Sequence, residues 1–465
     1  MNLCKFLFVL LLTFIRSAAA HQVVSLVAKP FFLEKAVSVR GGGRNAPGKA
    51  KIQPVEPSTE GASIAAEVFN LVKTIVGVGV LSLPAGVAAF GNAPSAAIPA
   101  VFIISIIGIL SGYGFALIGK CCAYTGATSY RDAWSKTVGE GSSWIPAVSA
   151  TVKTSLACLS CSMVLGDTFS SIFRIERNLS LLAVTLTALL PLCLLKNLKA
   201  LAPFSLLGVI GIFYTALAMT IRYLDGSYVL PEGSLGSSLP GDLQPSFGDK
   251  GIESVFTSSS LILVCMLSTA YMAHFNAAKF YIELKNNTVP RFHQVVRCGF
   301  GISILLMVSM TLLGFLTFGE NSSGLVLNNY SVNDSWMSLS RIAVALSLLF
   351  SYPLAFAGFR DGVLDMLKVP GEKRTSLNLN ILTITLLSAI TFLASILRNV
   401  SFVLAFGGAT FGNALTYVFP ALMYRAVVKQ QDREDEMTGV NIAMTSAVMG
   451  IVMGIIGAKM ALKKI

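Results

Sequence analysis

The sequence predicts an all-α membrane protein that crosses the bilayer about eleven times. Of its 465 residues, 54% are hydrophobic and only 12% are charged, a balance too apolar for a soluble globular protein. Runs of roughly 20 apolar residues, long enough for a helix to cross a hydrocarbon core about 30 Å thick, recur along the chain. Because these runs are continuous rather than alternating, they argue against a membrane β-barrel.

The predicted spans follow one another without a charge-rich soluble domain between them. They lie near residues 66–90, 94–119, 145–173, 179–195, 201–221, 253–279, 298–318, 338–358, 378–397, 401–424 and 440–460. We therefore predict a single eleven-helix domain over residues 62–465.

The N-terminal part of the chain has a different character. In residues 1–20, Lys5 precedes an apolar run and three alanines follow it, which is typical of a secretory signal peptide. Residues 21–61 are basic, with a GGG turn and scattered prolines, and this composition predicts a disordered leader. The leader is interpreted either as the second half of an organelle address or as a tail facing the cytosol.

The distribution of charge predicts the orientation of the bundle. The net charge of +12 is spread over short loops, so no nucleic-acid partner is expected. Cations concentrate in the loops after even-numbered spans, which places the N-terminus of the bundle in the cytosol and its C-terminus outside or in a lumen. The loop between the seventh and eighth spans agrees, because it carries glycosylation sequons at Asn321, Asn329 and Asn333.

Several classes of site find no support in the sequence. With only three histidines, a metal site is not expected. There is no HExxH, no GxSxG and no carboxylate cluster within the spans, so we predict neither an enzyme nor a cofactor. None of the eight cysteines falls in a predicted outer loop, which argues against a structural disulfide. A channel is disfavoured for want of a filter repeat or a ring of charges.

The first span contains a stretch that weakens a helix. Within TIVGVGVLSLP (residues 74–84), Gly77, Gly79, Ser82 and Pro84 fall within two turns. Unpaired backbone groups are costly in lipid, so irregular backbone survives there only where it faces protein or a wet cavity. Half-helix ends attract a carboxylate at one side and a cation at the other, which suits an amino acid. The alternative is that the glycines only allow close helix packing.

The same residues carry a resemblance. FNLVKTIVGVGVLSLPAGVAAFG (69–91) resembles the first-helix signature of the amino acid/auxin permease family. Residues 271–296, 351–367 and 403–424 are similar to the family's sixth, eighth and tenth helices. The resemblance runs from about residue 62 to the C-terminus. It implies the leucine-transporter architecture, a 5+5 inverted repeat with discontinuous helices 1 and 6 and an extra C-terminal helix.

The resemblance also implies a substrate site between helices 1 and 6. We expect the substrate to contact these two segments at Thr74, Gly77, Val78, Gly79, Val80, Ser268, Thr269 and Tyr271. Helix 6 has no glycine or proline at the expected break, so its interruption rests on the resemblance alone.

Candidates for ion coupling lie in the same helices. Lys73 stands where sodium-coupled members usually have an asparagine, so its ammonium would replace sodium or exchange a proton. The alternative is that Lys73 reaches the interface, as Lys153 is also expected to do. His274 would titrate near neutral pH, or it makes a structural hydrogen bond.

The other coupling candidates each have a structural alternative. Asp167 is interpreted as lining the outer vestibule, as a proton acceptor, or as the partner of Arg174, seven residues on. Asn70 is expected to bond the unwound backbone of its own helix. Ser347 and Ser351 are candidate contacts for a cation or a carboxylate, or they are packing residues.

Together these observations predict a secondary active transporter that moves neutral amino acids by alternating access. A proton is the expected coupling ion, and sodium is disfavoured by Lys73. The alternative is an amino-acid sensor with little net flux. A signal-like N-terminus predicts a multi-pass protein derived from the secretory pathway, in the vacuolar or plasma membrane, with a plastid envelope left open.

Overall fold

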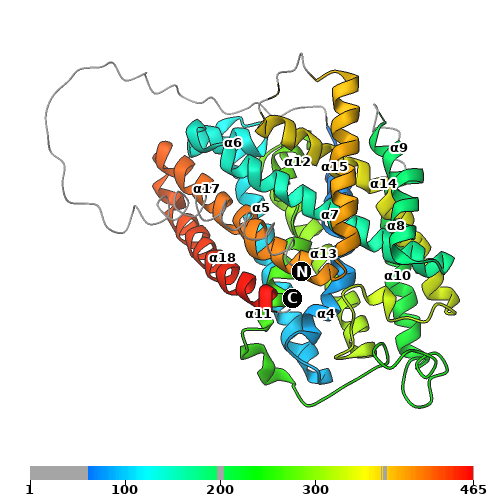
Figure 1. Ribbon diagram of the computed structural model, residues 1–465. Helices are drawn as coiled ribbons and strands as arrows, with labels where there is room; N and C mark the ends of the chain where they lie inside the picture. Colours follow the sequence, from blue (N-terminus) through cyan, green and yellow to red (C-terminus); the bar gives the residue numbers. More distant parts are fainter. Residues whose placement is uncertain (1–60, 196–203, 368, 370–373, 464–465) are drawn as a thin grey trace, which may run out of the picture. The chain divides into compact units, whose positions relative to one another are not determined.

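The computed structural model describes residues 61–195, 204–367, 369 and 374–463, all of which belong to one compact unit (Figure 1). The predicted signal segment 1–20 and nearly all of the leader 21–61 lie outside the described residues. The described residues are mostly helical and contain only isolated β-bridges, as the all-α prediction requires.

Long apolar helices form the body of the protein. In the described residues, eight helical segments are long and apolar enough to cross a membrane, and one bent pair would add a ninth. Six of the eight are built on single long helices: α5 (Ala97–Thr125), α7 (Trp144–Phe173), α13 (Val289–Phe318), α14 (Ser335–Met366), α15 (Ser376–Ile396) and α18 (Met437–Lys463). Local signals set their ends: Thr375 caps α15 by accepting from Asn378 N, and Gly126 ends α5 in the left-handed region at φ 65°.

The remaining elements are shorter or interrupted. They are α3 (Ile64–Ile75), α4 (Leu83–Ala88), α6 (Tyr130–Thr137), α8 (Arg177–Val184), α9 (Leu190–Cys193), α10 (Phe204–Leu224), α11 (Ser260–Ala270), α12 (Ala277–Glu283), α16 (Val400–Gly407) and α17 (Phe419–Gln430). The apolar helices Arg177–Cys193 and Ile210–Leu224 coincide with the fourth and fifth predicted spans. The count of eleven spans and the inverted repeat stay predictions.

The first predicted span is interrupted, as its sequence indicates. Helix α3 ends at Ile75, and Gly77 adopts an extended conformation (φ −119°, ψ −154°). A short 3-10 helix (Val78–Ser82) follows, and α4 begins with Pro84 in its first turn. The two halves are bent by 43° relative to each other. The alternative of a continuous helix with packed glycines is therefore wrong.

The sixth predicted span is interrupted as well. Helix α11 ends at Ala270, residues 271–273 are not helical, and a 3-10 turn (His274–Asn276) leads into α12. No glycine or proline marks this break, and its cause is tertiary. The Tyr271 hydroxyl donates to the Ile104 carbonyl of α5 (3.2 Å), and the Tyr271 ring stacks on Phe300 of α13.

The two interruptions meet. A Cβ placed on Gly79 would lie 3.2 Å from the Cβ of Ala270, at the end of α11. Helix α4 continues this contact, because a Cβ on Gly86 would lie 2.9 Å from the Leu263 side chain of α11. The absence of a side chain at both glycines lets the broken helices pack backbone to backbone.

Helix α11 is covered on another side by an irregular helix. Residues Gly408–Gly412 and Ala414–Val418, between α16 and α17, form π-helical turns. A Cβ on Gly408 would fall 1.7 Å from the Cys265 carbonyl oxygen of α11. The glycine-rich stretch thus allows the backbones of the two helices to pack closely.

Candidate functional site

The candidate substrate contacts at the first interruption differ in their exposure. Gly77 is exposed, and a Cβ placed on it would meet nothing within 4 Å, so its backbone borders open space. Thr74 is also exposed, and its hydroxyl donates to the Asn70 carbonyl of its own helix (2.8 Å). Val80 is buried, and Gly79 is covered by Ala270. The side chain of Val78 lies outside the described part of the structure.

Candidates on α11 are buried beside the second break. Ser268 donates to the Val264 carbonyl (3.1 Å), Thr269 to the Leu404 carbonyl of α16 (2.8 Å), and Tyr271 to α5. All three hydroxyls are thus bonded to protein carbonyls in this conformation. The groups left to face a ligand here are backbone groups of the interrupted segments, together with Thr74 and Gly77.

His274 makes the structural hydrogen bond that the sequence allowed. Its side chain is fully buried, and Nε2 donates to the Ser111 carbonyl of α5 (2.9 Å). The bond fixes the tautomer, and Nδ1 has no hydrogen-bond partner among the described residues. Gly114 makes room for this contact, because its Cβ would meet both the His274 ring and the Thr416 carbonyl. His274 therefore ties α5 to the second break.

Asp167 pairs with Arg177 rather than with Arg174, which corrects the expectation from sequence. Helix α7 ends at Phe173, and Arg174 takes a left-handed conformation (φ 55°), so the seven-residue spacing no longer places it on the face of Asp167. Arg177 opens α8, bonds Asp167 and donates to the Ala394 carbonyl of α15 (3.0 Å). The pair therefore joins three helices.

The remaining coupling candidates lie on other packing faces. Ser347 packs against α10, since a Cβ on Gly208 would meet its hydroxyl at 2.4 Å. Ser351 donates to the Leu348 carbonyl of its own helix (3.3 Å). Asn70 is exposed, and Lys73, half-buried in the last turn of α3, is compatible with either of its interpretations.

Lys153 does not reach the interface, which corrects a second expectation. It is only 6% exposed. The cause is the tight packing of α7 on α14: a Cβ on Gly362 would lie 2.2 Å from the Thr151 hydroxyl and one on Gly358 3.9 Å from the Thr154 methyl.

Glu67 is a residue that reasoning from the sequence missed. Its side chain is 1% exposed, and Oε2 has no hydrogen-bond partner among the described residues. The chain just before α3 pairs with the chain just after α12: Ala62 N donates to the Glu283 carbonyl (2.7 Å), and Lys285 N donates to the Ala62 carbonyl (2.9 Å). In the sequence, Glu67 is a lone carboxylate at the edge of an apolar run. Such a residue is easily interpreted as lying at the membrane interface.

On the other side of the breaks lies a hollow. A cavity of about 210 Å³ is lined by Ala85 and Ala88 of α4, Ile262 of α11, Phe402 of α16 and Glu320 of the loop after α13, among others. The start of α3 is thus tied down by backbone hydrogen bonds, whereas α4 borders an open space.

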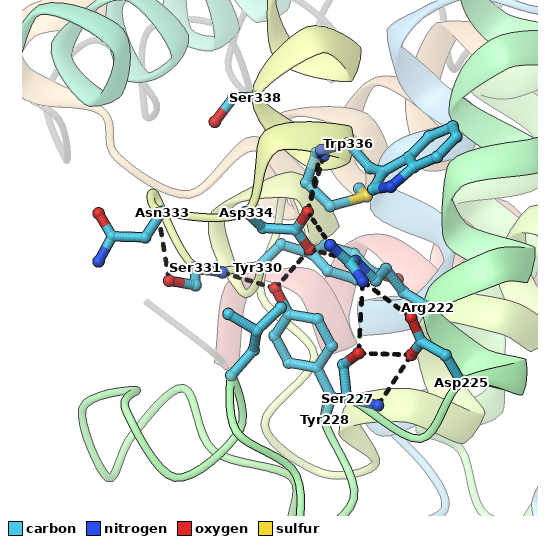
Figure 2. Close-up of polar contacts among 12 residues, drawn as sticks. Arg222, Asp225, Ser227, Tyr228, Tyr330, Ser331, Asn333, Asp334, Trp336 and Ser338 are labelled. Carbon is cyan, nitrogen blue, oxygen red and sulfur yellow. Dashed lines mark hydrogen bonds and ion pairs between the residues drawn. The ribbon is translucent and has the colours of Figure 1, made fainter.

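The loop that carries the sequons is held by a buried ion pair (Figure 2). Arg222, near the end of α10, donates through Nε and Nη2 to the two oxygens of Asp334 (both 2.8 Å). Tyr228 donates to the same carboxylate (3.0 Å), which in turn caps α14. Burial and the Asp334 charge raise the pKa of Tyr228, so its phenol stays protonated. Arg341 of α14 holds the loop by donating to the Leu327 and Tyr330 carbonyls.

Fold and site together define a multi-pass helical membrane protein with two interrupted helices, whose interruptions pack against each other. The chain belongs to the family of transmembrane amino acid transporter proteins, which it matches over residues 60–462.

Individual relatives are distant in sequence. Amino acid transporter AVT6E of Arabidopsis thaliana is 23% identical over 86% of this chain and 83% of its own length. Putative sodium-coupled neutral amino acid transporter 11 of Danio rerio is 22% identical over 85% of this chain and 86% of its own. Vacuolar amino acid transporter 7 of Saccharomyces cerevisiae is 26% identical over 63% of this chain and 57% of its own.

Proposed function

We propose that the protein is a secondary active transporter that moves neutral amino acids by alternating access and is driven by a proton gradient. The observation that carries this is the meeting of the two interruptions, where Gly79 packs on Ala270 and Gly77 borders open space. Interrupted helices leave backbone donors and acceptors without helical partners, and these groups suit the carboxylate and ammonium of an amino acid.

The substrate class follows from family and chemistry together. Relatives carry the names of neutral and of vacuolar amino acid transporters, without agreement on a single substrate. Backbone groups recognise what all amino acids share, and the buried hydroxyls of Ser268, Thr269 and Tyr271 are already bonded within the protein. A net charge on the substrate side chain would need a partner of opposite charge. None of the eight predicted substrate-contact residues carries a charge. These features favour neutral substrates.

Alternating access needs one side closed while the other is open. The backbone pairing of Ala62 with residues 283 and 285 closes the start of α3 against the end of α12, while the cavity beside α4 lies beyond the breaks. In the predicted orientation this is an outward-facing or occluded form. Rupture of this pairing would release the start of α3 from the end of α12.

Glu67 is the residue that we propose carries the coupling proton. A carboxylate buried without a partner is strongly disfavoured, so the closed form favours the neutral acid. The charged side chains of α12 that act on it are Glu283 and Lys279. Separation of α3 from α12 would hydrate Glu67 and release the proton on the cytosolic side.

The test is uptake of labelled neutral amino acids into proteoliposomes at zero membrane potential. A gradient of one pH unit is worth about 1.4 kcal/mol, so coupling to one proton sustains a roughly tenfold accumulation. We expect Glu67→Gln to abolish accumulation while substrate exchange continues. Glu140→Gln is the matched control, because Glu140 is exposed before α7 and is not among the charged groups that act on Glu67. This variant should accumulate substrate as the parent does.

Other results would redirect the proposal. Accumulation under a sodium gradient alone would refute proton coupling, and Lys73→Asn in the same assay tests whether this lysine is what replaces sodium. Binding without accumulation under either gradient would favour the sensor.

A further inference from the structure

A groove lies between α5, α13, α17 and α18, apart from the interrupted helices. Its volume is about 470 Å³, within the range of roughly 300–1,000 Å³ typical of ligand sites. Its two long walls are residues 109–120 of α5 and residues 293–304 of α13. At 1.5 Å per helical residue, each wall is roughly 16 Å long, about half the thickness of a hydrocarbon core.

The groove is apolar along its length and basic at one end. Ile109, Leu117, Phe300 and Ile304 line the apolar part, and Ile109 is 64% exposed, as expected of a side chain that faces the bilayer. The basic end is formed by Lys120, near the C-terminus of α5, with His293 and Arg297 near the N-terminus of α13. No carboxylate is among the described lining residues.

The three basic side chains differ in whether they form hydrogen bonds or ion pairs with the rest of the protein. Lys120 forms an ion pair with Glu436 (2.9 Å) and donates to the Tyr424 hydroxyl (3.1 Å). Arg297 is exposed, and neither it nor His293 makes a hydrogen bond or ion pair with another residue of the described structure. Two basic side chains at the mouth of the groove thus remain available to an anion.

We propose that this groove binds an anionic glycerophospholipid of the leaflet in contact with its basic end. The phosphate lies between Arg297 and His293, with Lys120 behind it, and one acyl chain follows the apolar walls towards the middle of the bilayer. Charge complementarity favours an anionic over a zwitterionic head group, since each lysine or arginine near an anionic surface contributes about 1 kcal/mol. Basic pockets between membrane helices on the cytosolic side are sites of this type, and the predicted orientation places the basic end there.

A soluble anion would use only one end of the groove. Inorganic phosphate would meet Arg297 and His293 but leave the apolar walls uncovered, whereas an acyl chain removes that surface from contact with mobile lipid. The bound lipid would touch α5, α13, α17 and α18 at once and so hold α17 and α18 against α13.

Native mass spectrometry of the full chain in detergent tests the proposal, with phosphatidylserine and phosphatidylcholine titrated separately. We expect tighter binding of phosphatidylserine. Arg297→Gln should weaken it by about fivefold, which corresponds to one cation, and leave phosphatidylcholine unchanged. Gly301→Phe should weaken both lipids, because Gly301 lines the groove and its Cβ would meet no atom within 4 Å, so the ring enters the groove without disturbing the packing.

Lys279→Gln is the matched control, since this lysine is 69% exposed and lies outside the groove. Each variant is first checked for a parental size-exclusion profile. Equal binding of the two lipids, or unchanged binding by Arg297→Gln and Gly301→Phe, would overturn the proposal. So would displacement of the phosphatidylserine by inorganic phosphate alone. None of these outcomes bears on amino acid uptake, so the lipid site and the transport function fail separately.

Discussion

The carboxylate of Asp334 offers a quantitative test of what holds the loop between α13 and α14 in place (Figure 2). Its side chain is 0% exposed. It accepts from Arg222 at 2.8 Å twice, from the Tyr228 hydroxyl at 3.0 Å, and from the backbone amides of Trp336 (3.0 Å) and Met337 (3.3 Å). The perturbation we consider is Asp334→Asn, because asparagine caps a helix about as well as aspartate but carries no charge.

The expected cost comes from the ion pair. Removal of one partner of a buried pair typically costs about 3–5 kcal/mol. Arg222 is 17% exposed and keeps Asp225 at 2.8 Å, so the lower end of that range, about 3 kcal/mol, applies to Asp334→Asn. Asp334→Ala also removes the cap of α14 and should cost about 1 kcal/mol more.

The assay is the midpoint of thermal unfolding of the full chain in detergent, followed by size exclusion after heating. A loss of about 3 kcal/mol should lower the midpoint by roughly 5 °C or more. Asp225→Asn is the matched control: it bonds the same arginine but is 33% exposed, so it should cost less than about 1 kcal/mol. Equal midpoints for the two asparagine variants would refute the argument that burial, rather than contact with Arg222, sets the cost.

Three further predictions test other contacts. Gly408→Ala should cost about 1–3 kcal/mol, because its Cβ would overlap a backbone carbonyl of α11; thermal unfolding measures it. Arg177→Gln should destabilise by about 3 kcal/mol, since it strands a largely buried carboxylate, whereas Arg174→Gln should cost less than about 1 kcal/mol in the same assay. In cells that glycosylate, Asn333→Gln, whose asparagine is exposed, should lose one glycan's share of the gel shift, whereas Asn329→Gln, whose carboxamide is buried and bonded at both ends, should keep the parental shift.

Controls make these outcomes decisive. Gly301→Ala adds the same methyl group where nothing lies within 4 Å, so a cost equal to that of Gly408→Ala would contradict the packing argument. Equal midpoints for the two arginine variants would contradict the pairing with α8. A glycan retained in Asn333→Gln and lost in Asn329→Gln would contradict the described conformation of the loop.

The sequence predicted those features of the fold that depend only on neighbouring residues. The first interruption follows from Gly77 and Pro84, because both oppose an α-helix whatever surrounds them. The second has no such local cause. Helix α11 stops where Tyr271 reaches Ile104 and where the His274 ring reaches α5, and these partners lie more than 150 residues away in the chain. Only the resemblance to a family located that break.

Charged residues inside the helices were the least predictable part of the site, and the reason is geometric. A spacing rule assumes that the helix continues, and the left-handed Arg174 ended α7 just where the rule was applied to Asp167. The expectation that a lysine near a helix end reaches the membrane interface likewise assumes that its side chain can extend to water. The packing of α7 on α14 keeps Lys153 buried instead. Glu67 escaped notice for the same reason, because nothing in the residues around it shows that its side chain is buried. Whether a charge in a membrane helix is structural or functional is therefore decided by which distant segment covers it. This is why Glu67, whose buried Oε2 has no hydrogen-bond partner among the described residues, is a better candidate for the coupling proton than Asp167, which Arg177 already neutralises.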